Sequence, residues 1–194
     1  PDADCGKKFF VVHNGFIEIY GELKEALVGS GHCFRSETDT EVVAHLIEEE
    51  MKFAANFDGA MEIALGKITG AYAFGIIHSA EPDAIYFARL GSPLVLGIGD
   101  GEYFLASDPT ALAGLVKKVV YLKDGQRGKI TPKGFWVSPT RAKVEVLDLE
   151  IEQAQKGNFP HFMLKEIFEG AEVVEAAMRG RLLEKEGRVR LGGL

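Results

Sequence analysis

The chain has 194 residues, of which 46% are hydrophobic, and it carries a formal net charge of −7. This length and apolar fraction can support the packed core of one sizeable domain, or of one domain with an extension. The acidic balance, with no block of like charges, argues against a nucleic-acid-binding protein, which would need a basic face. No apolar run is long enough to span a bilayer, and the polar segment from Pro1 to Lys8 is no signal peptide. The composition therefore predicts a cytoplasmic protein with neither nucleic acid nor membrane as a partner.

Cysteine and histidine are few and widely spaced. Cys5 and Cys33 form no disulfide framework, and free thiols in a reducing compartment are the expectation. The five histidines show no local metal-ligand spacing, so the sequence predicts no metal site. We expect Cys33 to be a buried spectator on a strand, and His13 and His45 to be satisfied structural histidines.

The N-terminal part of the chain reads as one short strand followed by helices. The apolar run from Phe9 to Val12 predicts a strand, and Asn14-Gly15 behind it is typical of a turn. Thr38 and Glu41 have the spacing of a capping box. The spacing of apolar residues predicts helices over 17–27, 42–51 and 60–68.

Beyond residue 70 the pattern changes to short strands punctuated by glycine. Asp108-Pro109 predicts the start of a short helix ending at Leu115, and Asp124-Gly125 predicts a turn. A longer helix is predicted over 161–181. Strands are predicted over 71–78, 84–89, 94–98, 103–106, 119–122, 128–130, 135–137 and 144–147. Because these strands follow one another without helical crossovers, we expect an α+β fold with mostly antiparallel sheets.

Asn14 and Gly15 admit two interpretations. The first is a tight turn, in which both residues adopt a backbone conformation that most others avoid. The second is an oxyanion hole, in which the Asn14 side-chain amide and the Gly15 backbone N–H donate to an amide oxygen that gains negative charge during acyl transfer. Glycine suits that role because it lets the backbone approach the substrate closely.

Asp39 also admits two interpretations. An acidic residue in the first turn of a helix is favoured by the helix dipole without any further role. Alternatively, the carboxylate holds the α-ammonium group of a substrate amino acid through charge-assisted hydrogen bonds.

Two segments carry a resemblance to a known family. His13-Asn14-Gly15 is followed by Glu18 and Tyr20, and Ser36 to Val42 reads SETDTEV and is followed by Ala44-His45-Leu46-Ile47. Both segments resemble the glutamine-hydrolysing domain of the glucosamine-6-phosphate synthases, a family of N-terminal-nucleophile amidotransferases. Shorter matches to the same family lie at 70–73, 88–95, 105–108, 163–169 and 190–194.

The resemblance implies a four-layer αββα N-terminal-nucleophile hydrolase fold, incomplete at its N-terminus. It implies hydrolysis of glutamine to glutamate and ammonia, and use of the ammonia to convert fructose 6-phosphate to glucosamine 6-phosphate, without a metal or organic cofactor. Asn14 and Gly15 would form the oxyanion hole, and Asp39 would bind the α-amino group of glutamine. Residues 1–160 would be a partial glutaminase domain. Residues 161–194 would be a helix and linker toward a sugar-isomerase domain, through which the whole protein would form a homodimer.

The sequence departs from the family at the nucleophile. The family's attacking group is a cysteine at the first position of the mature chain, whereas this sequence starts with Pro1. Cys5 has no α-amine of its own to act as a base, so we do not assign it that role. We expect the nucleophile to precede Pro1 and the chain alone to be inactive. Two alternatives stay open: a non-catalytic binding or regulatory module of the same fold, and another amidotransferase such as an amidophosphoribosyltransferase or an asparagine synthetase.

Overall fold

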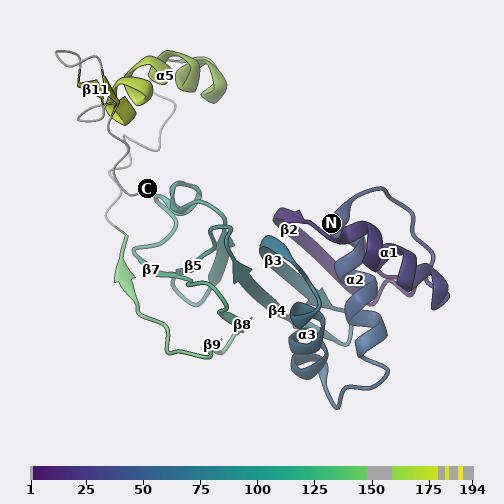
Figure 1. The fold of residues 1–194 in the computed structure, drawn as a ribbon. Coiled ribbons are helices and arrows are strands. Elements are labelled where there is room, and N and C mark those ends of the chain that lie inside the picture. The colour runs from purple at the N-terminus through teal and green to yellow at the C-terminus, as the bar shows by residue number, and fades with distance from the viewer. Residues whose placement is uncertain (1, 148–158, 179–181, 184–187, 190–194) are drawn as a thin grey trace. The chain divides into compact units, whose positions relative to one another are not determined.

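The computed structural model describes residues 2–147, 159–178, 182–183 and 188–189 (Figure 1). Contacts divide the chain into two compact units, Pro1–Asp148 and Leu149–Leu194. The helices of the first unit are α1 (Tyr20–Gly29), α2 (Asp39–Glu50), α3 (Phe57–Gly66) and the short 3-10 helix η1 (Pro109–Leu112). The second unit contains α5 (Phe162–Met178) and the antiparallel pair β11 (Leu182–Leu183) and β12 (Arg188–Val189). None of the described helices is long and apolar enough to cross a membrane.

The strands of the first unit form two antiparallel sheets. The larger sheet has the order β1-β2-β3-β4-β8-β9, and the smaller has the order β10-β7-β5-β6. Their bounds are β1 (Asp2–Ala3), β2 (Phe9–Ile17), β3 (Gly70–His78), β4 (Glu81–Leu90), β5 (Val95–Ile98), β6 (Tyr103–Ala106), β7 (Lys118–Tyr121), β8 (Arg127–Thr131), β9 (Gly134–Ser138) and β10 (Glu145–Val146). All pairings are antiparallel, so the predicted α+β class with antiparallel sheets is confirmed.

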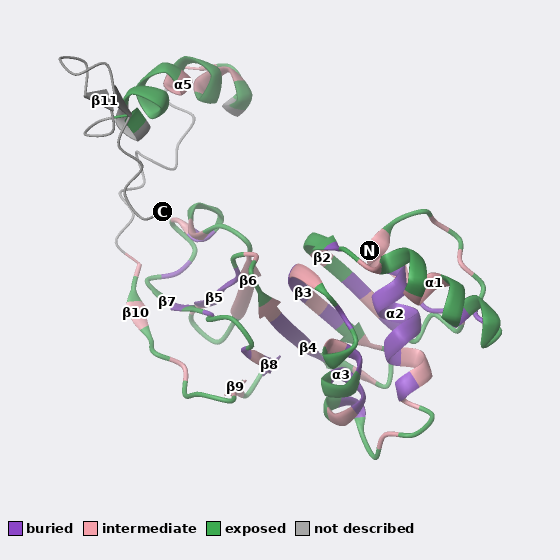
Figure 2. Ribbon diagram, viewed as in Figure 1, coloured by how far each residue is buried: buried purple, intermediate pink, exposed green. Residues whose placement is uncertain are grey.

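Three apolar clusters separate the layers of the first unit. α1, α2 and α3 cover one face of the larger sheet, and α2 is buried along most of its length (Figure 2). Residues such as Phe87, Leu96 and Val120 fill the space between the two sheets. On the outer face of the smaller sheet, Leu112 of η1 packs on Val95 and Val119. Alternate residues of each strand point to opposite faces, which is why one sheet can serve two cores.

The observed elements differ from the sequence-based expectations chiefly around β2. The strand does not end at Val12 but continues through Asn14 and Gly15 to Ile17, and α1 begins later than expected. The short helix after Asp108 is a single 3-10 segment, although Asp108 caps it as expected, accepting the Thr110 N–H at 2.7 Å.

The predicted division at residue 160 stays a prediction. The boundary between the two compact units falls after Asp148, and residues 148–158 lie outside the described part of the chain. Most of the predicted C-terminal linker, residues 187 and 190–194, also lies outside it.

Candidate functional site

Asn14 and Gly15 lie on the half of β2 that has a neighbouring strand on only one side. β3 pairs with β2 along its full length, opposite Ala73 and Tyr72 at these two residues, so the tight-turn interpretation is wrong. β1 pairs only with Phe10 and Val11. In the described part of the chain, no strand lies beside the rest of that edge of β2. Its backbone groups are therefore available to a ligand or to another segment of chain.

The backbone N–H of Gly15 points toward this open edge. The N–H of Ile17 donates to Oδ2 of Asp39 at 2.8 Å, whereas the N–H of Glu18 donates to the Thr69 carbonyl, next to β3, at 2.9 Å. Backbone groups along a strand alternate in direction, so residues 15 and 17 direct their N–H groups to the same side. The Gly15 N–H and the Asp39 carboxylate therefore lie on the same side of β2.

Position 15 accepts only glycine. Its φ is +133°, and a Cβ atom there would lie 2.0 Å from the Ala71 carbonyl oxygen and 2.7 Å from Oγ of Ser92. The missing side chain lets β2 and β3 stay paired while the residue remains exposed. The contact with Ser92 is one that the sequence did not indicate, because it follows β4 and reaches Gly15 only in the folded sheet.

Asn14 occupies the opposite face of β2 from the helices. Val11 and Ile17 are buried under the helices, whereas Asn14 is exposed and shares its face with Val12 and Phe16, which are 55% and 57% exposed. The Asn14 side-chain amide can therefore donate a hydrogen bond to a ligand that approaches from solvent. Together, residues 14 and 15 offer one side-chain donor and one backbone donor in succession, the two kinds of donor that an oxyanion hole uses.

Asp39 is the first residue of α2, where the helix terminus favours a carboxylate. Its Oδ2 holds the Ile17 N–H, while its Oδ1 lies 3.8 Å from Nδ1 of His13, and the side chain is 26% exposed. One oxygen therefore ties α2 to β2, and the other keeps capacity to accept a hydrogen bond from a cationic group. The fold brings Asp39 to the strand that carries Gly15, as the predicted site requires.

His13 completes this corner and is not the satisfied histidine that the sequence predicted. Its ring is 2% exposed, Nδ1 lies 3.4 Å from Oγ1 of Thr40, and Nε2 makes no hydrogen bond within the described residues. Burial lowers the pKa of His13, and the charge of Asp39 and the Ala71 carbonyl only partly oppose this. Burial therefore favours the neutral imidazole, which places no positive charge beside the carboxylate.

Glu41 fixes the loop that leads into Asp39. Its carboxylate accepts the N–H groups of Arg35 at 2.7 Å and Ser36 at 2.6 Å, and the Ser36 hydroxyl at 2.6 Å. Burial raises the pKa of Glu41, but these hydrogen bonds outweigh it, so the net pKa lies below its ordinary value. The predicted capping box is wrong, because Thr38 makes no side-chain cap bond. Glu41 instead pairs with Ser36, and the spacing of these two residues was the sequence signal for that contact.

The two cysteines lie in different surroundings from those expected. Cys33 is exposed in the loop between α1 and α2, so the prediction of a buried strand residue is wrong. Cys5 lies in the turn between β1 and β2, with its Sγ 3.6 Å from Nδ1 of His45 and 3.9 Å from Nδ1 of His32. These contacts lead away from the open edge of β2.

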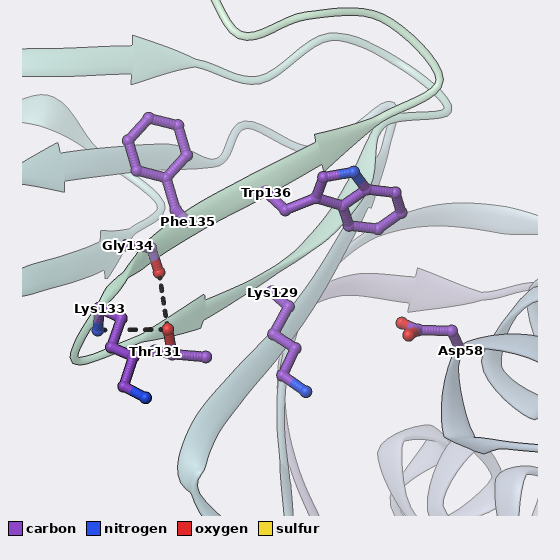
Figure 3. A pocket seen from close by; sticks show the side chains of 7 residues that line it. All are labelled: Asp58, Lys129, Thr131, Lys133, Gly134, Phe135 and Trp136. Atoms are coloured by element: carbon purple, nitrogen blue, oxygen red, sulfur yellow. Dashed lines mark hydrogen bonds between the residues drawn. The ribbon is translucent and has the colours of Figure 1, made fainter.

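A separate hollow lies beside the β8–β9 hairpin (Figure 3). In the sheet order, β3 and β4 lie between this hairpin and β2. The Thr131 hydroxyl is used within the hairpin, donating to the Gly134 carbonyl at 3.1 Å, and the Lys129 ammonium donates to Glu81 at 2.5 Å. We assign no reaction to it. The volume is about 420 Å³, and the lining residues are Asp58, Lys129, Thr131, Lys133, Gly134, Phe135 and Trp136.

Comparison with known proteins gives one family. Residues 2–114 match the glutamine amidotransferase domain family. The chain is 46% identical to the glutamine–fructose-6-phosphate aminotransferase (isomerizing) of Chlorobaculum tepidum over 100% of this chain and 33% of that protein. It is 45% identical to the protein of that name from Thermococcus kodakarensis, over 93% of this chain and 31% of that protein. The chain thus spans about a third of the length of the curated relatives it matches.

Solved structures give the same fold. Glutamine phosphoribosylpyrophosphate amidotransferase from B. subtilis, complexed with ADP and GMP, superposes with a TM-score of 0.60 and 26% identity over 74% of this chain and 30% of that chain. The predicted N-terminal-nucleophile amidotransferase fold is thereby confirmed. The family match includes Asn14, Gly15 and Asp39 and covers more than half of the sequence. The chain therefore belongs to the glutamine amidotransferase domain family.

Proposed function

We propose that this chain is the glutamine-hydrolysing part of a glutamine–fructose-6-phosphate aminotransferase. Identities of 46% and 45% to proteins of that name, over nearly the whole chain, support this assignment. The identity to the phosphoribosylpyrophosphate amidotransferase structure is 26%, which favours the first class of amidotransferase over the second.

The hydrogen bond from the Ile17 N–H to Asp39 carries the proposal. It holds a partly exposed carboxylate beside the open edge of β2, two residues beyond Gly15. A glutamine molecule lying along this edge would meet an acceptor for its α-ammonium group and N–H donors for its side-chain oxygen. A neutral His13 leaves the Asp39 charge free to bind that ammonium group.

Asn14 and Gly15 act on the oxygen of the glutamine side-chain amide. When a thiolate adds to the amide carbon, the carbonyl electron pair moves onto this oxygen, and both donors stabilise the resulting anion. The base that took the thiol proton returns it to the amide nitrogen, so collapse of the intermediate expels ammonia and leaves a thioester, which water then hydrolyses to glutamate. We assign the thiolate to a cysteine outside this sequence, and to neither Cys5 nor Cys33.

The assignment is tested in a protein that joins this chain to the family's cysteine nucleophile. Asn14→Ala lowers kcat for glutamine hydrolysis by about 100- to 1,000-fold, the usual loss for one oxyanion donor. Asp39→Asn raises KM for glutamine by roughly 10- to 100-fold, the loss expected for one hydrogen bond to a charged group. The split between kcat and KM separates the two roles.

Two matched variants serve as controls. Val12→Ala alters an exposed residue on the same face of β2 as Asn14. Asp58→Asn is the same aspartate-to-asparagine change as Asp39→Asn, but in the first turn of α3. Both are expected to keep wild-type kcat and KM. Retention of full kcat by Asn14→Ala, or an unchanged KM in Asp39→Asn, contradicts the assigned roles.

The isolated 194-residue chain is expected to release no ammonia from glutamine. Glutaminase activity of this chain that disappears in Asn14→Ala would show that the nucleophile lies within it. The competing proposal, a non-catalytic module, requires that no activity appears when the cysteine segment is joined to the chain.

The whole protein is proposed to use the released ammonia. We assign residues 1–160 to the glutaminase domain and 161–194 to a helix and linker toward a sugar-isomerase domain, in a cytoplasmic homodimer. Formation of glucosamine 6-phosphate from glutamine and fructose 6-phosphate, with a dimeric mass in light scattering, is the expected result. If the whole protein hydrolyses glutamine but forms no amino sugar, only the proposed use of the ammonia is contradicted.

A further inference from the structure

Cys5, His32, His45 and Glu48 bring four metal-binding atoms together beside α2. One atom from each residue lies within 4.8 Å of the other three. The two histidine Nδ1 atoms are 3.2 Å apart, and Oε2 of Glu48 is 3.2 Å from Nδ1 of His32. Sγ of Cys5 lies 3.6 Å from Nδ1 of His45 and 3.9 Å from Nδ1 of His32.

The outer nitrogens of both histidines face carboxylates. Nε2 of His32 lies 2.8 Å from Oε2 of Glu49, and Nε2 of His45 lies 3.4 Å from Oε1 of Glu41. A carboxylate at Nε2 holds the imidazole proton there, which leaves the Nδ1 lone pair directed into the cluster. Paired carboxylate–histidine contacts of this kind are the usual outer support of histidines that bind a metal.

Glu48 is left without a donor. Its Oε2 is buried and makes no hydrogen bond within the described residues, although it lies 3.2 Å from Nδ1 of His32. Two imidazole lone pairs, a carboxylate oxygen and a sulfur therefore converge with too few protons among them. An unsatisfied buried carboxylate oxygen is costly, and a cation at the centre would satisfy all four atoms.

The backbone around the cluster is well ordered by hydrogen bonds. Asp4 is buried and accepts the N–H groups of Gly6, Lys8 and Phe9 at 2.7–2.9 Å, which shapes the turn that presents Cys5. The backbone N–H of Cys33 donates to Sγ of Cys5 at 3.1 Å, a contact that stabilises a thiolate.

We infer that Cys5, His32, His45 and Glu48 bind one Zn²⁺ ion. Zinc–nitrogen bonds of about 2.0–2.1 Å and zinc–sulfur bonds of about 2.3 Å place tetrahedral ligand atoms roughly 3.3–3.6 Å apart. Five of the six separations are 3.2–3.9 Å and the sixth, between Cys5 and Glu48, is within 4.8 Å, so the cluster is close to this geometry. Binding releases the Cys5 thiol proton to solvent, and the thiolate and carboxylate balance the ion's charge.

The mixed sulfur, nitrogen and oxygen ligands select zinc over calcium or magnesium, which prefer oxygen alone. Four protein ligands close the coordination shell, so the ion is structural. A depression of about 160 Å³, lined in part by Cys5, His32 and Glu48, opens onto the cluster and provides an entry path.

The ion would join three separate segments of the chain. Cys5 belongs to the β1–β2 turn, His32 to the loop after α1, and His45 and Glu48 to α2. The metal-bound His45 faces Glu41, which in turn holds the loop before Asp39.

The test uses the 194-residue chain, stripped with a chelator and titrated with Zn²⁺ against a chromophoric competitor. One equivalent is expected to bind and to raise Tm. Cys5→Ser is expected to lower the zinc affinity by more than about 100-fold, and Glu49→Gln, which removes only an outer support, by about 10-fold. Co²⁺ substitution supplies a spectroscopic readout, since a thiolate ligand adds a sulfur-to-cobalt charge-transfer band.

Cys33→Ser is the matched control, because it removes the other cysteine and keeps the backbone donor. It is expected to retain both the affinity and the cobalt band, whereas Cys5→Ser loses the band while keeping the wild-type circular dichroism. If Cys5→Ser fails to fold, Glu48→Gln replaces it and is expected to weaken zinc binding by at least about 10-fold. Failure of the wild-type chain to bind zinc, or equal loss in both cysteine variants, overturns the inference.

Discussion

The two ends of helix α2 hold polar sites of opposite character. At its N-terminus, Asp39 lies beside the open edge of β2, where the donors are backbone N–H groups and the site is partly exposed. Farther along, His45 and Glu48 face a buried group of lone pairs with too few donors. The first arrangement suits an amino acid with an ammonium group and a developing oxyanion, and the second suits a metal cation.

Glu41 connects the two sites. Its carboxylate holds the N–H groups of Arg35 and Ser36 and also faces Nε2 of His45 at 3.4 Å. One buried side chain thus supports both the loop before Asp39 and a proposed metal ligand. The proposed glutamine corner, formed by Asn14, Gly15 and Asp39, depends on backbone shape, whereas the metal cluster depends on side-chain lone pairs. Substitutions away from Glu41 can therefore perturb either site alone.

The largest effect is expected from changing the backbone at the glutamine corner. Gly15→Ala places a Cβ atom 2.0 Å from the Ala71 carbonyl oxygen at a φ of +133°. Strain and overlap are expected to lower the free energy of unfolding by about 2–4 kcal/mol, measured by urea denaturation. In the folded fraction, zinc affinity should be unchanged, because position 15 lies outside the metal cluster.

The control for this variant is Gly21→Ala. Position 21 lies in α1, and an added Cβ meets no atom within 4 Å. The substitution should stabilise the chain by about 0.5–1 kcal/mol, because alanine loses less backbone entropy in a helix. Equal effects at both positions would show that the β2 edge does not constrain residue 15.

The residues of the proposed glutamine corner could be named from the sequence, and their immediate surroundings could not. Asn14, Gly15 and Asp39 stand in short motifs that resemble those of a known family, so their roles could be proposed from local sequence. The continuation of β2 through Asn14-Gly15 could not, because the ladder with β3 overrides the local preference of this pair for a turn. The contact of Gly15 with Ser92 also depends on pairing between distant strands.

The metal cluster illustrates what local spacing cannot predict. Only His45 and Glu48 are close in sequence, and Cys5 and His32 join them from other segments. The expectation of no metal site rested on local ligand spacing, which is informative only when the ligands share one turn or loop. The strand order and the helix packing decide this proximity, and both depend on the whole first unit.

A smaller effect on stability is expected from Glu48→Gln, and its sign should differ between the metal-free and the zinc-bound chain. In the metal-free chain, Glu48→Gln should raise the free energy of unfolding by about 1 kcal/mol, because an amide can donate to an Nδ1 atom where the carboxylate has no donor. Addition of Zn²⁺ should raise the free energy of unfolding of this variant less than that of the wild type. Thermal melts with chelator and with zinc measure both.

Glu25→Gln is the matched control for that inversion. Glu25 is exposed on α1, so its substitution should change stability by less than about 0.5 kcal/mol in either condition. If Glu48→Gln destabilises the metal-free chain as well, the carboxylate has a donor there, and the contrast between the two ends of α2 is weaker than the contacts indicate.

The smallest effect concerns the pH response of the glutamine corner. Burial lowers the folded-state pKa of His13 below its ordinary value of 6.5, so the folded chain binds fewer protons at this site than the unfolded chain. The stabilising contribution of the neutral ring is complete above pH 6.5 and is lost as the pH falls from there through the folded pKa. The ring resonances of His13, followed by NMR, should titrate below 6.5. Asp39→Asn should lower that pKa further, because the Asp39 charge opposes the effect of burial. His13→Gln should remove this part of the pH dependence of stability. Titration of His13 at or above 6.5 would contradict the dominance of burial and would place more positive charge beside Asp39, leaving the carboxylate less able to bind a substrate ammonium group.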